Sequence, residues 1–261
     1  MKPKKSLGQN FLNDKNILSE IVNAGDINKN DTILEIGPGT GNLTELILKK
    51  NPKHLIVIEK DKNLSLKLVD KFKNKIKVIN KDILECFDEL KINEPLKVFG
   101  NLPYNISTKI LTSFIKQDHL DKKYKKFIFV FQKEVADRIV AEENTKSYGR
   151  LTILTSWKTN RLKVFDISPN CFYPMPKVWS SLVTLIPKSN ILILNKVKNL
   201  EHVTNIFFNH RRKMIKKPFN QLFNANTGVQ KKLKLSLNLR PQNLDFNTYY
   251  NLAKEYENLN S

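Results

Sequence analysis

The stretch "EIGPGTG" (residues 35–41) lies between an apolar run, "TILEI" (32–36), and an amphipathic segment, "NLTELILKK" (42–50). Three glycines at alternate positions let a chain turn sharply from a strand into a helix and let a ligand approach the backbone. The dinucleotide-binding pattern needs its third glycine at position 42, where this chain has Asn42, and a P-loop needs a Gly-Lys-Ser/Thr ending, which is missing. The stretch therefore predicts a strand–turn–helix unit with a binding loop of another kind.

Short apolar runs alternate with amphipathic segments over the first two thirds of the chain. The runs span 32–37, 54–61, 76–82, 96–101 and 126–134, and they are rich in Ile, Val and Phe. Between the first two, Leu43, Leu46 and Ile47 recur at helical spacing. This alternation predicts an α/β fold with an open, mostly parallel sheet and helices on both faces. Two later apolar runs, near 161–165 and at 180–186, could close the sheet as a hairpin.

The chain is strongly basic. Its 261 residues include 45 Lys and Arg against 25 Asp and Glu, a formal net charge of +20. Such an excess is typical of proteins that bind a polyanion, most often nucleic acid. An alternative stays open, because only six of these residues are Arg and Asn is plentiful, a bias that an AT-rich genome also produces. The arginines are the more informative residues, since the guanidinium fork pairs with phosphate better than Lys does.

The pattern changes after Pro187. The pattern of residues 191–261 is typical of short helices that are interrupted at Pro218, Gly228 and Pro241. Residues 188–261 also carry 13 Lys and Arg against 4 Asp and Glu. We therefore expect an α/β domain at 1–187 and a small helical domain at 188–261.

Cysteine usage and the N-terminal residues indicate an ordinary intracellular protein. Cys86 and Cys171 are the only cysteines, and neither a Cys-x-x-Cys pair nor a His-rich spacing indicates a metal. The first residues are basic but reach no secretory apolar segment, and the longest apolar run, 127–131, is too short to span a bilayer. We expect a cytoplasmic monomer with no membrane partner, no disulfide and no metal.

Acidic residues follow the predicted strands, where a ligand of the glycine loop would lie. Glu59 closes the second run and can accept hydrogen bonds from both ribose hydroxyls, and Asp82 ends the third run, where it could meet an adenine amino group. With Glu35 these carboxylates would repel phosphate. A loop with glycines and acids but no Lys or Arg suits an adenosine without phosphate, such as S-adenosylmethionine. The alternative is a plain glycine turn, which any α/β protein can contain.

The fourth run ends in "NLPY", Asn101 to Tyr104. Methyl transfer needs a desolvated nucleophile aligned with the methyl group. The adenine amine is a poor nucleophile, and two acceptors can hold its hydrogens: the Asn101 side-chain oxygen and the backbone carbonyl of Leu102 or Pro103. Tyr104 can stack on the base and offset part of the cost of unstacking it. The alternative is a turn with a half-buried tyrosine.

Further motifs accompany the glycine loop and "NLPY". They are "SLGQNFL" (6–12), "QKEVADRI" (132–139), "YGRL" (148–151), "CFYPMPKVWSS" (171–181) and "NHRRKMI" (209–215). Over nearly the whole chain the sequence resembles the small-subunit ribosomal RNA adenine N6,N6-dimethyltransferase family. The resemblance implies a class I S-adenosylmethionine-dependent methyltransferase fold with a small all-α C-terminal domain that binds rRNA. It also implies transfer of two methyl groups to N6 of each of two adjacent adenosines in the 3′-terminal loop of 16S rRNA, within a small-subunit assembly intermediate.

The same resemblance assigns roles to single residues. The cofactor-binding residues that it implies are Asn10, Leu12, Gly37, Gly39, Glu59, Asp82 and Asn101. The catalytic residues that it implies are Asn101, Leu102, Pro103, Tyr104 and Phe172. Tyr104 would stack on one face of the target base, and Phe172 could cover the other. Trp179 departs from the family pattern, which often has an acid after "PKV", and no role is assigned to it.

Five basic residues are candidates for contact with RNA: Arg138, Arg150, Arg211, Arg212 and Lys213. "NHRRKMIKK" (209–217) is the densest basic run, and as a helix it would put Arg211 and Arg212 on different sides. We expect it to contact rRNA phosphate, with a solvated face as the alternative. Arg138 and Arg150 flank an acidic stretch, 134–143, and could instead form ion pairs. "QNFL" (9–12) is expected to order as a lid over cofactor or RNA, or simply to pack on the core.

Three other functions stay open at this point. A resistance-type relative would methylate adenine of 23S rRNA. An N6-adenine DNA methyltransferase shares motifs like "NLPY" but usually has a larger target-recognition domain than 74 residues. A non-catalytic rRNA-binding assembly factor could have kept the fold, although intact Glu59, Asp82, Asn101 and Tyr104 argue against it.

Overall fold

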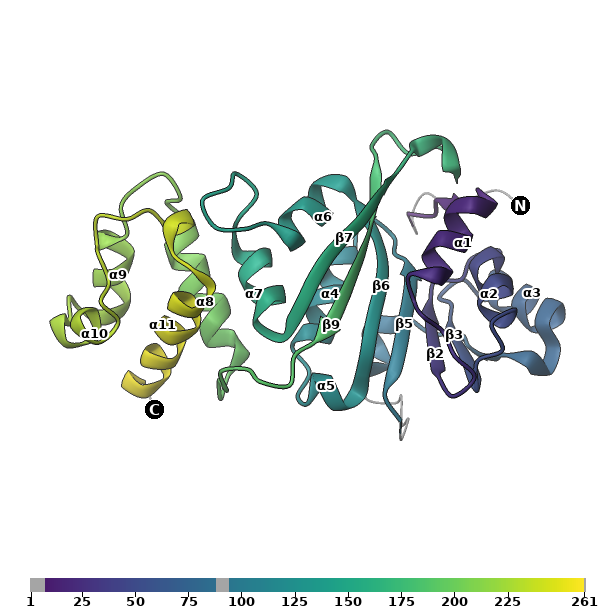
Figure 1. Cartoon of the computed structure of the whole chain (residues 1–261), viewed down its shortest axis with the longest axis horizontal. Helices are drawn as coiled ribbons and strands as arrows, with labels where there is room; N and C mark the ends of the chain where they lie inside the picture. Colours follow the sequence, from purple (N-terminus) through teal and green to yellow (C-terminus); the bar gives the residue numbers. More distant parts are fainter. Residues whose placement is uncertain (1–7, 88–93, 261) are drawn as a thin grey trace. The chain divides into compact units, whose positions relative to one another are not determined.

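The computed structural model describes residues 8–87 and 94–260 (Figure 1). These described residues fall into two compact units. The first contains those up to Ala136 together with Asn160–Lys188, and the second contains Asp137–Thr159 and the residues from Ser189 onward. The chain passes from the first unit to the second after Lys188, one residue from the boundary that we expected after residue 187. However, residues 137–159, which we expected in the first domain, cluster with the C-terminal helices.

In the described part of the first unit, seven strands form one sheet. Their order is β4 (Lys77–Ile79), β3 (His54–Ile58), β2 (Thr32–Ile36), β5 (Leu96–Asn101), β6 (Tyr124–Gln132), β9 (Ser180–Pro187) and β7 (Thr159–Ile167). Neighbouring strands from β4 to β6 are parallel, whereas β9 is antiparallel to β6. The predicted α/β fold is confirmed, and the two late apolar runs lie side by side at one edge. Ile36 lies opposite both Ile58 and Gly100, so β2, β3 and β5 end level with one another.

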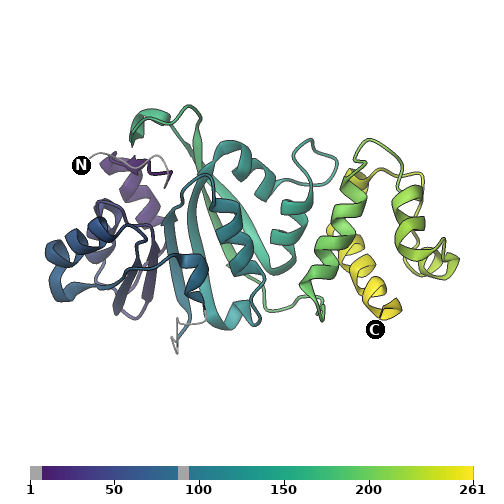
Figure 2. The same ribbon diagram turned by 180° about the vertical axis from the view of Figure 1, so that it is seen from behind.

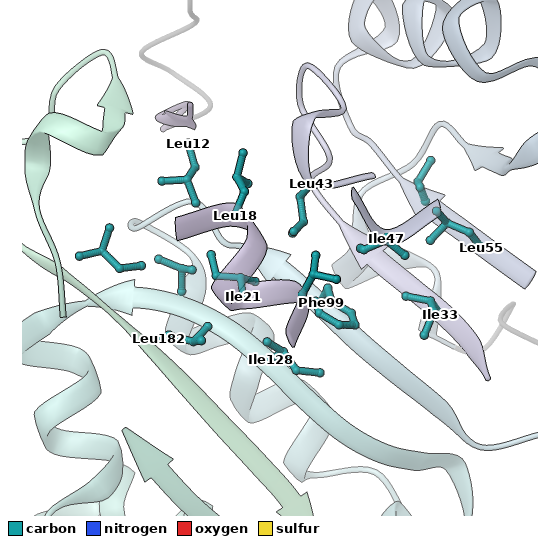
Figure 3. Close-up of a cluster of buried hydrophobic side chains, with 14 of the residues drawn as sticks. Leu12, Leu18, Ile21, Ile33, Leu43, Ile47, Leu55, Phe99, Ile128 and Leu182 are labelled. Carbon is teal, nitrogen blue, oxygen red and sulfur yellow. The ribbon is translucent and has the colours of Figure 1, made fainter. Parts of the chain in front are cut away.

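Helices cover both faces of this sheet. α1 (Lys15–Asn23), α2 (Asn42–Leu48) and α3 (Lys62–Phe72) contribute to one buried cluster, in which Ile21 and Ile47 pack with Phe99 of β5 (Figure 3). α4 (Ser107–Ile115) lies on the other face, which Figure 2 shows from behind. There Phe114 packs edge-on against Phe127, with ring centroids 5.2 Å apart. The remaining helices of this part are α5 (Leu120–Lys123) and the first half of α6 (Lys133–Val140).

Two short strands tie the N-terminal arm to a distant segment. β1 (Phe11–Leu12) pairs antiparallel with β8 (Phe172–Tyr173), so that Leu12 lies opposite Phe172. The Asn13 amide extends the pairing by donating to the Cys171 carbonyl at 2.9 Å. Leu12 and Phe172 are both buried in the core cluster. The "QNFL" arm is thus held by main-chain hydrogen bonds and by the burial of Leu12.

The second unit is helical. It contains α7 (Arg150–Lys158), α8 (Val197–Phe208), α9 (Lys216–Phe223), α10 (Thr227–Lys232) and α11 (Phe246–Leu259). α8 packs against α7, α9 and α11, and α7 is buried from Thr152 to Lys158. The Tyr148 hydroxyl donates to the Leu244 carbonyl at 2.8 Å. These contacts explain why residues 137–159 belong to this unit, since their buried polar groups find partners among the C-terminal residues.

The basic run does not form the helix considered above. α8 ends at Phe208, residues 209–215 form turns, and α9 begins at Lys216. The Ile215 side chain is buried, and its amide donates to the Leu239 carbonyl at 2.8 Å, which draws the chain away from a helical path. In the described part of the chain, none of the helices has both the length and the apolar character needed to cross a bilayer.

Candidate active site

A cavity of about 190 Å³ lies at the carboxyl ends of β2, β3 and β5. All seven residues expected to bind the cofactor line it: Asn10, Leu12, Gly37, Gly39, Glu59, Asp82 and Asn101. Leu102, Pro103 and Tyr104 line the same cavity. The structure brings these residues together because neighbouring parallel strands end on one side of the sheet, where their following loops converge.

The glycine loop has a left-handed backbone at the cavity. Gly37 and Gly39 have φ angles of 65° and 58°, a region that side chains rarely adopt. A Cβ on Gly39 would lie 2.8 Å from the Phe11 ring, whereas a Cβ on Gly37 would meet nothing within 4 Å. The backbone at Gly37 therefore borders open space, where a ligand can approach closely.

Glu59 is buried at the end of β3 and holds the loops on either side. Its Oε2 accepts a hydrogen bond from the Gly39 amide at 3.1 Å, and its Oε1 accepts one from the Asp61 amide at 2.8 Å. Burial raises the pKa of this carboxyl, and the backbone amides offset only part of that rise. The Lys60 amide bonds this carboxyl as well, which leaves one of its four lone-pair positions open to a ribose hydroxyl.

Asp82 lies where a short 3₁₀ turn, Ile83–Glu85, begins. Its Oδ1 accepts the Leu84 amide at 2.9 Å, and its Oδ2 pairs with Lys60 Nζ at 2.9 Å. Desolvation raises the pKa of Asp82, but the Lys60 and Leu84 hydrogen bonds outweigh it and hold the pKa below its ordinary value. Asp82 is therefore ionised at neutral pH and can accept a hydrogen bond from an amino group.

Glu35 is a buried carboxyl whose structural role the sequence reasoning missed. It lies in β2, is 1% exposed, and accepts a hydrogen bond from Thr44 Oγ1 at 2.7 Å. Burial raises its pKa to about 8; the Thr44 bond opposes this rise, and the neighbouring Glu59 charge adds to it. A neutral Glu35 thus links β2 to α2 beneath the glycine loop. The signal was present, since a lone acid inside the apolar run "TILEI" indicates a buried carboxyl.

Asn101 is the last residue of β5 and lines the cavity. Its Nδ2 donates to the Asn10 carbonyl at 2.8 Å, whereas no described residue donates to its Oδ1. The Pro103 carbonyl accepts the Ile106 amide at 3.1 Å, but the described residues supply no donor to the Leu102 carbonyl. Among the described residues, Asn101 Oδ1 and the Leu102 carbonyl are therefore the acceptors of this motif that receive no hydrogen bond, and they are called the free acceptors below.

Tyr104 is half-buried at the cavity, and its hydroxyl lies 2.6 Å from Ser180 Oγ. Burial raises the pKa of the phenol more than the Ser180 bond lowers it, so Tyr104 is neutral at physiological pH. Ser180 is fully buried at the start of β9. The sequence analysis missed its role, although a hydroxyl opening the apolar run "SSLVTLI" was a usable signal.

Phe172 is the one expected catalytic residue that does not line the cavity. It is 4% exposed and packs in the core cluster with Leu12 and Leu18. The pairing of β8 with β1 places Phe172 opposite Leu12, and its ring is buried among the apolar side chains of this cluster. In this structure, Phe172 therefore presents no open face to a target base.

All five candidate RNA-binding residues lie in the second unit. Arg138 on α6, Arg150 at the start of α7, and Arg212 and Lys213 in the turn after α8 are exposed. Arg211 is different, because its Nε donates to Gln242 Oε1 at 3.1 Å and its Nη2 donates to the Thr145 carbonyl at 2.9 Å. The guanidinium of Arg211 thus joins three segments of the unit.

Known proteins are similar to this chain over nearly its whole length. A family model described as ribosomal RNA adenine dimethylase matches residues 1–258. The chain is 52% identical over 259 residues to ribosomal RNA small subunit methyltransferase A of Pelagibacter ubique, covering 99% of this chain and 98% of the relative. It is 40% identical over 255 residues to the protein of the same name from Ehrlichia ruminantium, covering 96% of each.

Two solved structures share the fold over most of their length. A dimethyladenosine transferase from Plasmodium falciparum aligns with a TM-score of 0.78 and 26% identity, covering 95% of this chain and 98% of that chain. The 23S rRNA methyltransferase ErmE aligns with a TM-score of 0.71 and 21% identity, covering 95% and 99%. With the family model matching nearly every residue, this protein belongs to the ribosomal RNA adenine dimethylase family.

Proposed function

We propose that this protein uses S-adenosylmethionine to dimethylate N6 of two adjacent adenosines in the 3′-terminal hairpin loop of 16S rRNA. The observation that carries the proposal is the pair of free acceptors, Asn101 Oδ1 and the Leu102 carbonyl, at a cavity lined by Glu59 and Asp82. Two relatives, 52% and 40% identical, are named as small-subunit enzymes, which favours this substrate over 23S rRNA.

The residues at the cavity fit S-adenosylmethionine. The open space at Gly37 leaves room for the methionine end, Glu59 can accept a ribose hydroxyl, and Asp82 can accept the adenine amine. The carboxylates disfavour a phosphorylated ligand but tolerate a cation. When bound, the cofactor supplies an electrophilic methyl group on a positively charged sulfur.

The acceptor pair accounts for how the target amine is oriented. Asn101 Oδ1 and the Leu102 carbonyl accept the two N6 hydrogens and thereby direct the nitrogen lone pair away from them. Stacking on Tyr104 contributes roughly 1–3 kcal/mol toward holding the base outside its helix. After the first transfer N6 keeps one hydrogen, so one acceptor still holds it. The proton released in each transfer passes to water, because a neutral amide oxygen does not take it up.

The second unit is the proposed rRNA-binding part. Arg138, Arg150, Arg212 and Lys213 are exposed there, and all four side chains can contact phosphate. The α/β unit then performs the chemistry and the helical unit binds rRNA of the small subunit. We further propose that the protein acts as a monomer in the cytoplasm on a small-subunit assembly intermediate, and that S-adenosylmethionine is used without a metal.

The test is transfer of labelled methyl groups from S-adenosylmethionine to undermethylated small subunits, followed by digestion and nucleoside analysis. The proposal expects label in N6,N6-dimethyladenosine of the small-subunit RNA. Label confined to large-subunit RNA would assign the protein to the resistance type instead. Subunit binding without label would indicate an assembly factor without activity.

A further inference from the structure

The segment from Tyr173 to Trp179, which joins β8 to β9, exposes large apolar side chains. Tyr173, Met175 and Val178 are exposed, and the Trp179 side chain is 50% exposed. Lys177 in the same segment is exposed as well. Tryptophan is a residue that folded proteins mostly bury, so an indole left in solvent near an active site points to a ligand.

Both ends of this segment are fixed to residues that line the cavity. At its start, β8 pairs with β1, whose Phe11 and Leu12 are part of the cavity wall. At its end, Ser180 hydrogen-bonds the Tyr104 hydroxyl. The Trp179 carbonyl also accepts the Lys133 amide at 2.9 Å, which fixes the backbone of Trp179 itself. The segment is therefore anchored at both ends to the cavity wall, although none of its own residues lines the cavity.

Strand register places the backbone of Trp179 at the same end of the sheet as the acceptor pair, and the alternation of side chains puts the indole on the face opposite that of Ser180. Asn101 lies opposite Val130, and Ser180 lies opposite Gln132, so Trp179 lies beyond the carboxyl ends of β5 and β6. From Asn101 it lies two strands away across the sheet and three residues further along the strand direction, beyond the end of β5. With a rise of about 3.3 Å and a strand spacing of about 4.8 Å, its Cα lies roughly 14 Å from that of Asn101. This separation suits a nucleotide close to the target, not the target base itself.

We infer that Trp179 forms a second base-binding site, on which an unpaired nucleobase near the target adenosine stacks. Tyr173 and Met175 extend the apolar surface, and Lys177 can contact the adjoining phosphate. Aromatic side chains recognise splayed single-stranded RNA in this way, whereas a protein partner would not need the flanking positive charge. The inference rests on the proposed function, since it takes an rRNA loop as the substrate.

Tryptophan fluorescence tests the contact directly. The chain has two tryptophans, and Trp157 is only 3% exposed, so quenching by added RNA reports mainly Trp179. The probe is a hairpin with the sequence of the 3′-terminal loop of 16S rRNA, titrated into the full-length protein. Quenching in the wild type that is absent in Trp179→Phe is expected. RNA binding, measured by filter retention, without any quenching would overturn the inference.

Methylation kinetics test the role. Trp179→Ala should raise the KM for small subunits roughly tenfold while kcat and S-adenosylmethionine affinity stay near wild type, and Trp179→Phe should restore most of the KM. The matched control is Leu162→Ala, which removes a 61% exposed apolar side chain from β7 and should leave KM unchanged. An unchanged KM in Trp179→Ala would overturn the inference. If the wild type fails to methylate small subunits, the proposed function fails instead, and the fluorescence titration still decides whether Trp179 binds a base.

Discussion

The side-chain amide of Asn101 donates to the main-chain carbonyl of Asn10 at 2.8 Å, across 91 positions of sequence. This bond determines which end of the amide is available to a substrate, because the nitrogen is used by the N-terminal arm and no described residue donates to the oxygen. The arm is itself held by the pairing of β1 with β8. The orientation of Asn101 therefore depends on a segment that the strand motif alone does not include.

Replacement of Asn101 by Ala should remove methylation and leave RNA binding nearly intact. Loss of one preorganised polar group at a reacting centre typically lowers kcat by about 100-fold or more. The amine contact is separate from the phosphate contacts, so the affinity for small subunits, measured by filter binding, should change little. A parallel collapse of RNA affinity and turnover would show that the role assigned to Asn101 is wrong.

Replacement of Glu59 should weaken cofactor binding before it affects anything else. Glu59→Ala removes the acceptor for a ribose hydroxyl together with the bond to the Gly39 amide, and Glu59→Gln keeps one acceptor oxygen. We expect S-adenosylmethionine affinity, measured by calorimetry, to fall about 10- to 100-fold in Glu59→Ala and less in Glu59→Gln. Glu45→Ala is the matched control, because Glu45 is an exposed acid on α2. Unchanged binding in Glu59→Ala would remove Glu59 from the cofactor site.

The contributions of the ring and of the hydroxyl of Tyr104 to methylation can be distinguished by comparing the kinetics of two variants. Tyr104→Phe keeps the stacking surface and loses only the 2.6 Å contact with Ser180, so we expect a loss of a few-fold, matched by Ser180→Ala. Tyr104→Ala removes the ring and should lower kcat/KM about 10- to 100-fold, as expected for a lost base–aromatic stack. Equal losses in the Phe and Ala variants would mean that the hydroxyl, not the ring, is what the reaction needs.

The sequence predicted the parts of the site that follow from strand topology. Gly37, Glu59, Asp82 and Asn101 all lie at or just after the carboxyl ends of strands, and parallel pairing brings such positions together whatever the details of packing. The same reasoning could not predict whether the side chain of a residue outside the main sheet is buried by other side chains. Phe172 is buried because its strand pairs with β1, a pairing of two-residue strands that no local pattern reveals.

The basic run shows the same limit. Its charge was evident in the sequence. That Arg211 forms hydrogen bonds within the unit, whereas Arg212 is exposed, depends on Gln242 and Thr145, which approach Arg211 only in the folded unit. Likewise, residues 137–159 join the second unit through contacts with helices that follow them by some forty residues or more. Long-range partners of this kind are set by packing and not by periodicity.

Arg211 and Arg212 should therefore respond differently to substitution. Arg211→Gln breaks hydrogen bonds between segments and should lower the free energy of unfolding by about 1–3 kcal/mol, measured by denaturant titration. The double variant Arg212→Gln, Lys213→Gln removes two exposed charges and should reduce the salt slope of rRNA binding by about two units without loss of stability. A slope that stays unchanged in the double variant would identify the turn as a solvated surface.

Glu35 should make the stability of the protein depend on pH in the opposite sense to a salt-bridged acid. Its pKa is raised from 4.5 to about 8 in the folded chain, so the unfolded chain releases this proton at lower pH than the folded chain does. The contribution of Glu35 to the free energy of unfolding is therefore at its maximum below about pH 4.5 and decreases as the pH rises toward about 8. The decrease is on the order of a few kcal/mol. Glu35→Gln keeps an acceptor for Thr44 Oγ1 but cannot ionise, so the difference in stability between variant and wild type should grow in favour of the variant over this range. Denaturant titrations of both proteins across the range measure that difference, and parallel stability profiles would show that Glu35 is ionised in the folded protein.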